Sequence, residues 1–196
     1  PLYIAVKENQ YSICELLIKA GANVNLRNTL GVTPLYRAIV LDNNQMLELL
    51  INNGANLEQK VGGDTALHSY IRINHGNIEG VKLLISKGAD LSARDSDGDS
   101  PLHSAIWHNQ GKVVELLIAA GANVNARNDN GLRPINIRSS LNLNQLLSSR
   151  LNNYEVKAGE NLYAIAKKYN TTVKAIRTIN RLESANLSPG QKLIIP

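Results

Sequence analysis

The chain has 196 residues, of which 43% are hydrophobic and 19% charged, with a formal net charge of +5. These values are typical of a soluble globular protein with one or two domains, and no apolar run approaches the roughly 20 residues that span a bilayer. The single cysteine, Cys14, excludes an intramolecular disulfide and a cysteine-based zinc site.

The positive charge lies mainly in the last quarter of the chain. Residues 1–150 carry 14 Lys and Arg against 13 Asp and Glu, whereas residues 151–196 carry 7 against 3. This excess indicates an anionic surface nearby. It is too small and too dispersed to predict nucleic-acid binding.

A short motif, Gly-Ala-Asn or Gly-Ala-Asp, recurs every 33 or 34 residues, starting at Gly21, Gly54, Gly88 and Gly121. Each copy follows a Leu-Leu-Ile block, and a second motif comes about a dozen residues later. The copies of the second motif are Thr33-Pro34-Leu35-Tyr36, Thr65-Ala66-Leu67-His68, Ser100-Pro101-Leu102-His103 and Arg133-Pro134-Ile135-Asn136. Self-similarity at this period predicts a stack of repeats.

The chemistry of each unit predicts two helices and a turn. Thr or Ser before Pro is a helix N-cap with a first-turn proline, so a short helix is expected over 35–41. The Leu-Leu-Ile block ends a second helix, and the glycine after it supplies a left-handed C-cap. Asn, Asp and Gly between units, as in Asp95-Ser96-Asp97-Gly98, are turn residues.

This pattern closely resembles the ankyrin repeat over residues 1–150, as about four units. The first unit lacks its leading turn, and the unit from Arg133 is short and polar, as expected of a terminal cap. Its polar residues are Arg138, Ser139, Ser140, Asn142 and Asn144. The resemblance implies a structural role for His68 and His103, which would bind neighbouring turns. His75 and His108 have no partner at metal-ligand spacing, so no metal site is expected.

The ankyrin resemblance also implies a protein partner on the concave face, formed by turn tips and the exposed side of the first helices. The candidate protein-binding residues are Leu30, Val32, Val40, Leu41, Arg72, Ile73, Asp97, Trp107 and His108. Trp107 is the only tryptophan, and an exposed tryptophan among apolar residues is typical of a binding hot spot. The alternative is that Trp107 folds back over a neighbouring repeat as part of the core.

A different pattern occupies residues 153–196. Tyr154-Glu155-Val156 predicts a strand, Asn161 is suited to cap a helix containing Leu162 and Ile165, and a second helix and a closing strand at 191–196 follow. The fold class is therefore mainly α: a repeat solenoid followed by a small β-α-α-β domain.

This second segment resembles the LysM module along its whole length, through Tyr154 to Tyr169, Ile179-Asn180 and Pro189-Gly190-Gln191-Lys192-Leu193. The resemblance implies binding of polymers that contain N-acetylglucosamine, namely peptidoglycan or chitin. The groove would be formed by Gly159, Glu160, Asn161, Leu162, Ile179, Asn180, Arg181 and Leu182. Glu160 and Asn161 depart from the Asp and the Thr or Ser usual in the family. The alternative is that these residues only cap and turn the fold.

The sequence contains no nucleophile–base pair, carboxylate dyad or phosphate-binding glycine loop, so neither an enzyme nor a cofactor is expected. An adaptor is expected instead, attached to peptidoglycan in a bacterial cell envelope or periplasm and holding a protein such as a wall enzyme. The alternative is a secreted effector or a cytoplasmic scaffold whose LysM fold binds no sugar. Because Pro1 lies inside a repeat, a processed or truncated start is expected, with no signal peptide visible.

Overall fold

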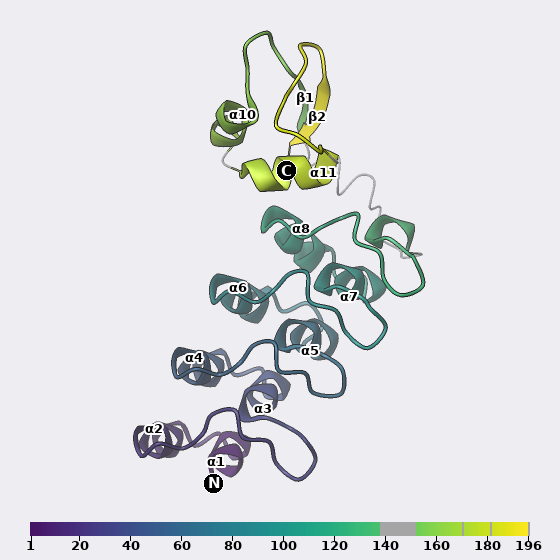
Figure 1. Cartoon of the computed structure of the whole chain (residues 1–196). Helices are drawn as coiled ribbons and strands as arrows, with labels where there is room; N and C mark the ends of the chain where they lie inside the picture. Colours follow the sequence, from purple (N-terminus) through teal and green to yellow (C-terminus); the bar gives the residue numbers. More distant parts are fainter. Residues whose placement is uncertain (138–151, 170, 181, 196) are drawn as a thin grey trace.

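The computed structural model describes residues 1–137, 152–169, 171–180 and 182–195. Residues 1–137 form a stack of helix pairs (Figure 1). The helices are α1 (Leu2–Lys7), α2 (Tyr11–Lys19), α3 (Pro34–Val40), α4 (Asn44–Asn52), α5 (Ala66–Ile73), α6 (Ile78–Ser86), α7 (Pro101–Trp107), α8 (Gly111–Ala119) and the 3-10 turn η1 (Pro134–Asn136).

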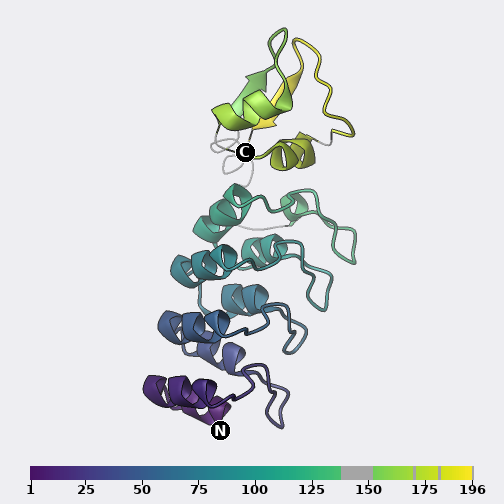
Figure 2. The ribbon, with the colours of Figure 1, turned by 60° about the vertical axis from the view of Figure 1, so that its left-hand side comes forward.

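The helices form two layers. The first helices of the units, α1, α3, α5 and α7, stack in one layer, and the second helices, α2, α4, α6 and α8, stack in the other (Figures 1 and 2). The turns project from the side of the first-helix layer (Figure 1). This is the solenoid that the repeat period predicts, and each unit buries its apolar side against its neighbours.

The core runs along the stack between the two layers. Leu35, Leu67 and Leu102 of the second motif are at most 4% exposed, as is the middle leucine of each later Leu-Leu-Ile block, for example Leu50. The second helices end as predicted, because the glycine after each adopts the left-handed backbone, with φ of 85° at Gly21.

The helix starts differ between units in a way that matters for the turns. The Thr33 hydroxyl accepts a hydrogen bond from the Tyr36 backbone N–H at 3.1 Å, an ordinary N-cap. Thr65 binds the ring of the histidine three residues later in place of such a cap, and Ser100 forms a capping box with His103 and also binds its ring. This difference follows from Tyr36 standing where His68 and His103 stand in the next two units.

The second domain has the predicted β-α-α-β order. Its elements are β1 (Asn152–Glu155), α10 (Leu162–Lys168), α11 (Val173–Asn180) and β2 (Lys192–Ile195). The strands pair antiparallel, with Tyr154 opposite Leu193. The buried core contains Tyr154, Val156, Leu162, Ile165, Ala166, Ile176, Leu193 and Ile195.

The expected terminal cap and the expected absence of a membrane-spanning segment can be compared with the structure only over the described residues. Within the described residues the short last unit contains the turn η1, and its predicted polar residues from Arg138 to Asn144 lie outside the part of the chain that the structure describes. Within the described part of the chain, no helix is long and apolar enough to cross a membrane.

Candidate functional site

His68 ties its own unit to the next turn. Its Nε2 lies 3.0 Å from the Asp99 carbonyl oxygen, and its Nδ1 lies 2.8 Å from the Thr65 hydroxyl. Because a carbonyl only accepts, Nε2 carries the proton and Nδ1 accepts from Thr65. Burial lowers the pKa of His68, which is fully buried. The neutral imidazole is therefore a structural tie, as predicted.

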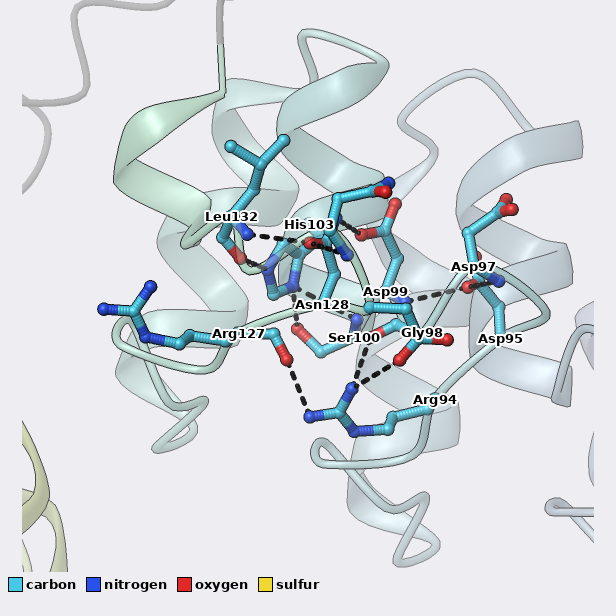
Figure 3. Close-up of polar contacts among 12 residues, drawn as sticks. Arg94, Asp95, Asp97, Gly98, Asp99, Ser100, His103, Arg127, Asn128 and Leu132 are labelled. Carbon is cyan, nitrogen blue, oxygen red and sulfur yellow. Dashed lines mark hydrogen bonds and ion pairs between the residues drawn. The ribbon is translucent and has the colours of Figure 1, made fainter.

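His103 repeats this arrangement one unit later. Its Nδ1 accepts from the Ser100 backbone N–H and hydroxyl, and its Nε2 donates to the Leu132 carbonyl at 3.1 Å (Figure 3). Arg94 adds a second tie, because its guanidinium donates to the carbonyls of Gly98 and Arg127 (Figure 3). The successive turns are thus held in fixed register and form a rigid platform.

Trp107 ends α7 beside this platform. Its indole N–H donates to Asp99 Oδ2 at 2.9 Å, and the other carboxylate oxygen of Asp99 accepts from Asn128 at 2.7 Å. Asp99 is 5% exposed, whereas Trp107 is 46% exposed. The ring is therefore fixed at one edge and open to solvent elsewhere, and it does not form part of the core.

Arg72, on α5, lies between two acidic side chains. Its guanidinium is 2.7 Å from Asp95 Oδ2 and 3.3 Å from Asp64 Oδ2. Burial raises the pKa of Asp64, the Arg72 cation lowers it, and the charges of Asp95 and Asp97 raise it further. Asp64 and Asp95 were not among the candidate residues, because their pairing with Arg72 depends on how neighbouring units stack.

His108 belongs to the same area, because it directly follows Trp107 at the end of α7. Its pKa is lowered first by burial and then by the Arg72 cation, while Asp64 raises it. The structure thus brings together Arg72, Asp97, Trp107 and His108, four of the nine candidate residues. We call these four, with Asp64, the Trp107 face.

The remaining candidates lie elsewhere on the turns and first helices or in partly buried positions. Leu30, at a turn tip, is 82% exposed, and Val40, at the end of α3, is 37% exposed. Val32 and Leu41 are half-buried, and Ile73 packs against the hydrophobic core. Leu30 and Val40 are therefore the more accessible apolar residues of this group.

In the second domain, the first predicted segment of the groove precedes α10. Gly159 is exposed and adopts φ of 81°. The Glu160 carboxylate accepts from the Tyr154 hydroxyl and from the Lys157 backbone N–H, and Asn161 caps α10 by accepting from the Ala164 N–H. Leu162 is 1% exposed, so only its main chain is available to a ligand.

The second predicted segment follows α11. The Asn180 amide donates to the Ile176 carbonyl at 2.9 Å, and Leu182 packs partly buried against the domain core. Arg177 donates to the carbonyls of Leu182 and Glu183 and so fixes the chain beyond the helix. Arg181 and the side chain of Ile179 lie outside what the structure describes.

Tyr163 is a further candidate that the sequence interpretation missed. It is 72% exposed on the first turn of α10, directly after the Gly159–Leu162 segment. The available signal was an aromatic residue between the buried positions Leu162 and Ile165, on the outward side of an amphipathic helix. An exposed aromatic ring at such a position can pack against a sugar ring.

No group of three or more His, Cys, Asp or Glu side chains that could hold a metal ion occurs among the described residues. Cys14 is buried, and burial raises the pKa of its thiol. Its surroundings therefore favour the neutral thiol over the reactive thiolate.

Comparisons with known proteins agree with both patterns. A family model of ankyrin repeats in three copies matches residues 2–95 and 58–128, and the LysM domain model matches residues 154–196. Both are non-catalytic binding domains: ankyrin repeats indicate protein–protein interaction, and LysM is a glycan-binding module.

Curated relatives that are named as ankyrin repeat proteins match about half of this chain. The chain is 33% identical over 112 residues to an ankyrin repeat protein of fowlpox virus, which covers 55% of this chain and 32% of the viral protein. It is 33% identical over 102 residues to the ankyrin repeat and SOCS box protein 11 of Danio rerio, and the match covers 52% of this chain and 34% of the fish protein. It is also 33% identical over 110 residues to the human transient receptor potential cation channel subfamily A member 1, and the match covers 55% of this chain and 10% of the channel protein.

The chain thus spans about a third or less of the length of these relatives. Since the repeat model alone matches well over half of its residues, the chain belongs to the ankyrin-repeat family and carries a LysM domain after the repeats.

Proposed function

We propose that the chain is a non-enzymatic adaptor that attaches a protein partner to a glycan. The LysM domain binds polymers of N-acetylglucosamine, with peptidoglycan as the ligand, and the Trp107 face binds the protein, a cell-wall enzyme being the partner class that suits this setting. The observation that carries the proposal is the presence of two binding modules for different ligand classes in one chain.

The glycan half of the proposal is supported by charge and by an exposed ring. Residues 151–196 carry four more basic than acidic residues, and peptidoglycan bears carboxylates. Tyr163 offers an exposed aromatic surface beside Gly159 and the Asn161 cap. A bacterial cell envelope is the proposed location, because peptidoglycan occurs there.

The protein half is supported by the state of Trp107. Hot spots of protein interfaces are enriched in tryptophan and arginine, and a side chain that is already fixed loses less conformational entropy when a partner binds. Trp107 is fixed by Asp99 and half-exposed, and Arg72 is fixed by Asp64 and Asp95 nearby. A partner would therefore bind there with little ordering cost.

Co-sedimentation with insoluble peptidoglycan, and in parallel with chitin, tests the glycan half. The whole chain is compared with a chain that ends at Arg150, with soluble N-acetylglucosamine oligomers as competitor. We expect peptidoglycan to sediment the whole chain but not the chain that ends at Arg150. We expect the soluble oligomers to release the whole chain from the polymer. Tyr163→Ala should weaken sedimentation, and Leu26→Ala, at an exposed leucine of the repeat stack, should not.

If neither polymer sediments the whole chain, the glycan half is wrong. The alternative function then applies, in which the chain is a protein-binding scaffold of a secreted effector or of the cytoplasm. Sedimentation by chitin without peptidoglycan would keep glycan binding and exclude the proposed ligand.

A further inference from the structure

The Trp107 face is acidic, although the repeat stack as a whole is nearly neutral. Asp64, Asp95, Asp97 and Asp99 lie within or beside the face, and Arg72 is the cation that the described contacts pair with them. Residues 1–150 as a whole, these side chains included, carry 14 basic and 13 acidic side chains. The negative charge is therefore concentrated where Trp107 is exposed.

The carboxylates of this area are not equivalent. Asp95 is fully buried and binds Arg72, and Asp99 is satisfied by Trp107 and Asn128. Asp97 is exposed, and its charge still raises the pKa of Asp64. Asp97 is therefore the carboxylate that a partner can reach, and a positive charge beside it would also relieve its repulsion with Asp64.

The exposed surface of Trp107 favours the same kind of partner. A guanidinium or ammonium group over an indole face is attracted by the ring electrons, and tryptophan is the best of the aromatic side chains for this contact. Since the indole N–H is already used by Asp99, the accessible part of the ring is its apolar surface. An acidic segment would meet the exposed Asp97 carboxylate, whereas the Arg72 cation is already paired with Asp64 and Asp95.

Resting on the proposed protein-binding function, we propose that the Trp107 face binds a basic, apolar protein segment. An arginine or lysine of the segment packs on Trp107 and pairs with Asp97, and its apolar neighbours cover the rest of the ring. The partner class is therefore a protein with an exposed cationic segment. An acidic segment is disfavoured because the exposed Asp97 carboxylate would repel it, and a neutral segment gains no charge pair there.

Selection from a display library of random short peptides on the intact protein tests this inference. The bound peptides are sequenced, and each enriched peptide is measured against the native chain, Asp97→Lys and Glu79→Lys by surface binding at low and physiological salt. Glu79→Lys is a matched control, because Glu79 is exposed on α6 and the substitution changes the charge by the same amount at a position outside the Trp107 face.

We expect enriched peptides to combine Arg or Lys with apolar residues. Asp97→Lys should weaken them about tenfold, and Trp107→Ala about thirtyfold, while Glu79→Lys leaves them unchanged. Salt should weaken binding, as it does for exposed charge pairs. Trp107→Ala leaves the Asp99 carboxylate with one hydrogen-bond donor fewer, so circular dichroism must show that this variant is folded. If Trp107→Ala is unfolded, the affinity of Asp97→Lys, a substitution at an exposed position, decides whether the inference holds.

Two other outcomes are distinguishable. If the enriched peptides are acidic or neutral but still depend on Trp107, the charge inference is overturned and the proposed protein-binding face stands. If peptides bind and none depends on Trp107 or Asp97, both the inference and the proposed face are overturned.

Discussion

The indole N–H of Trp107 and the Asp99 carboxylate are joined by a hydrogen bond of 2.9 Å between the end of α7 and the turn that precedes it. The bond serves two purposes, because it satisfies a carboxylate that is nearly buried and fixes the orientation of a half-exposed ring. Trp107 thus contributes both to the stability of the repeat stack, through Asp99, and to the exposed surface that is proposed to bind a protein.

We expect Trp107→Phe to lower the free energy of unfolding by about 1–2 kcal/mol, because the variant keeps a ring but leaves Asp99 with one donor fewer. Urea unfolding followed by far-UV circular dichroism measures this difference. The matched control is Val40→Ala, at a similarly exposed position on α3 without a polar contact. Equal midpoints for native chain and Trp107→Phe would show that the hydrogen bond contributes nothing.

Stability should fall between about pH 7 and pH 5 because of buried histidine. The pKa of His68 is lowered from 6.5, chiefly by burial, and that of His108 is also lowered. The unfolded chain therefore binds protons in this range that the folded chain does not, so the contribution is present above pH 6.5 and is lost on acidification. Chemical unfolding across this pH range measures the slope.

The variant His68→Gln identifies the source of this slope. It removes the titrating group and should flatten the pH dependence, although stability at pH 7 drops with the loss of the tie to Asp99. His75→Gln, at an exposed histidine, is the control. An unchanged slope in His68→Gln would assign the acid sensitivity to other groups.

Gly80→Ala should destabilise the stack by about 1–3 kcal/mol, even though alanine favours helices, because a Cβ at this position overlaps the Tyr70 ring. At the equivalent positions of the neighbouring units, the first helix has the small residue, Ala38 or Ala105, and the second helix has the larger one, Met46 or Val113, all of them buried. Tyr70 and Gly80 are thus one large and one small residue that fill the same space.

A double-mutant cycle checks this relationship. Tyr70→Ala alone should cost about 3–5 kcal/mol through the cavity that it leaves, and Tyr70→Ala with Gly80→Val should recover part of that loss. Strictly additive effects would show that the two positions are independent.

In the LysM domain, we expect Tyr154→Phe to raise the pKa of Glu160. The Tyr154 hydroxyl is the first cause that lowers this pKa below 4.5, and the Lys157 N–H is the second. The lowered pKa contributes stability above pH 4.5 that is lost as the pH falls through the folded-state value, and the variant reduces that contribution. Carboxyl carbon NMR between pH 2 and pH 6 measures the shift, with Glu183 as internal control. A constant Glu160 pKa would contradict the assignment.

Features that depend on neighbouring residues in the chain were predictable. The period of the Gly-Ala motifs, the Thr33 cap and the left-handed Gly21 follow from local chemistry, and the structure contains them. The His68 and His103 ties came from the ankyrin resemblance, because nothing local specifies a carbonyl 31 or 29 residues away.

What was missed depends on packing between units. Arg72 was recognised as a surface position, but its pairing with Asp95, 23 residues away, requires the relative placement of two repeats. The acidic character of the Trp107 face arises in the same way, because its aspartates come from two separate turns, before α5 and before α7. Tyr163 was missed for a different reason, because the helical spacing of Leu162 and Ile165 already placed it on the outward side of its helix, and only its 72% exposure in the structure drew attention to the ring.

Because the chain has one tryptophan, nearly all of its long-wavelength emission originates beside Asp97 and Asp99. The local carboxylates should repel iodide and attract caesium, so the two quenchers should differ in efficiency in the direction opposite to that expected from the net charge of +5. The protein thus contains its own optical reporter of one surface, and any ligand that covers this surface will protect the emission from both ions.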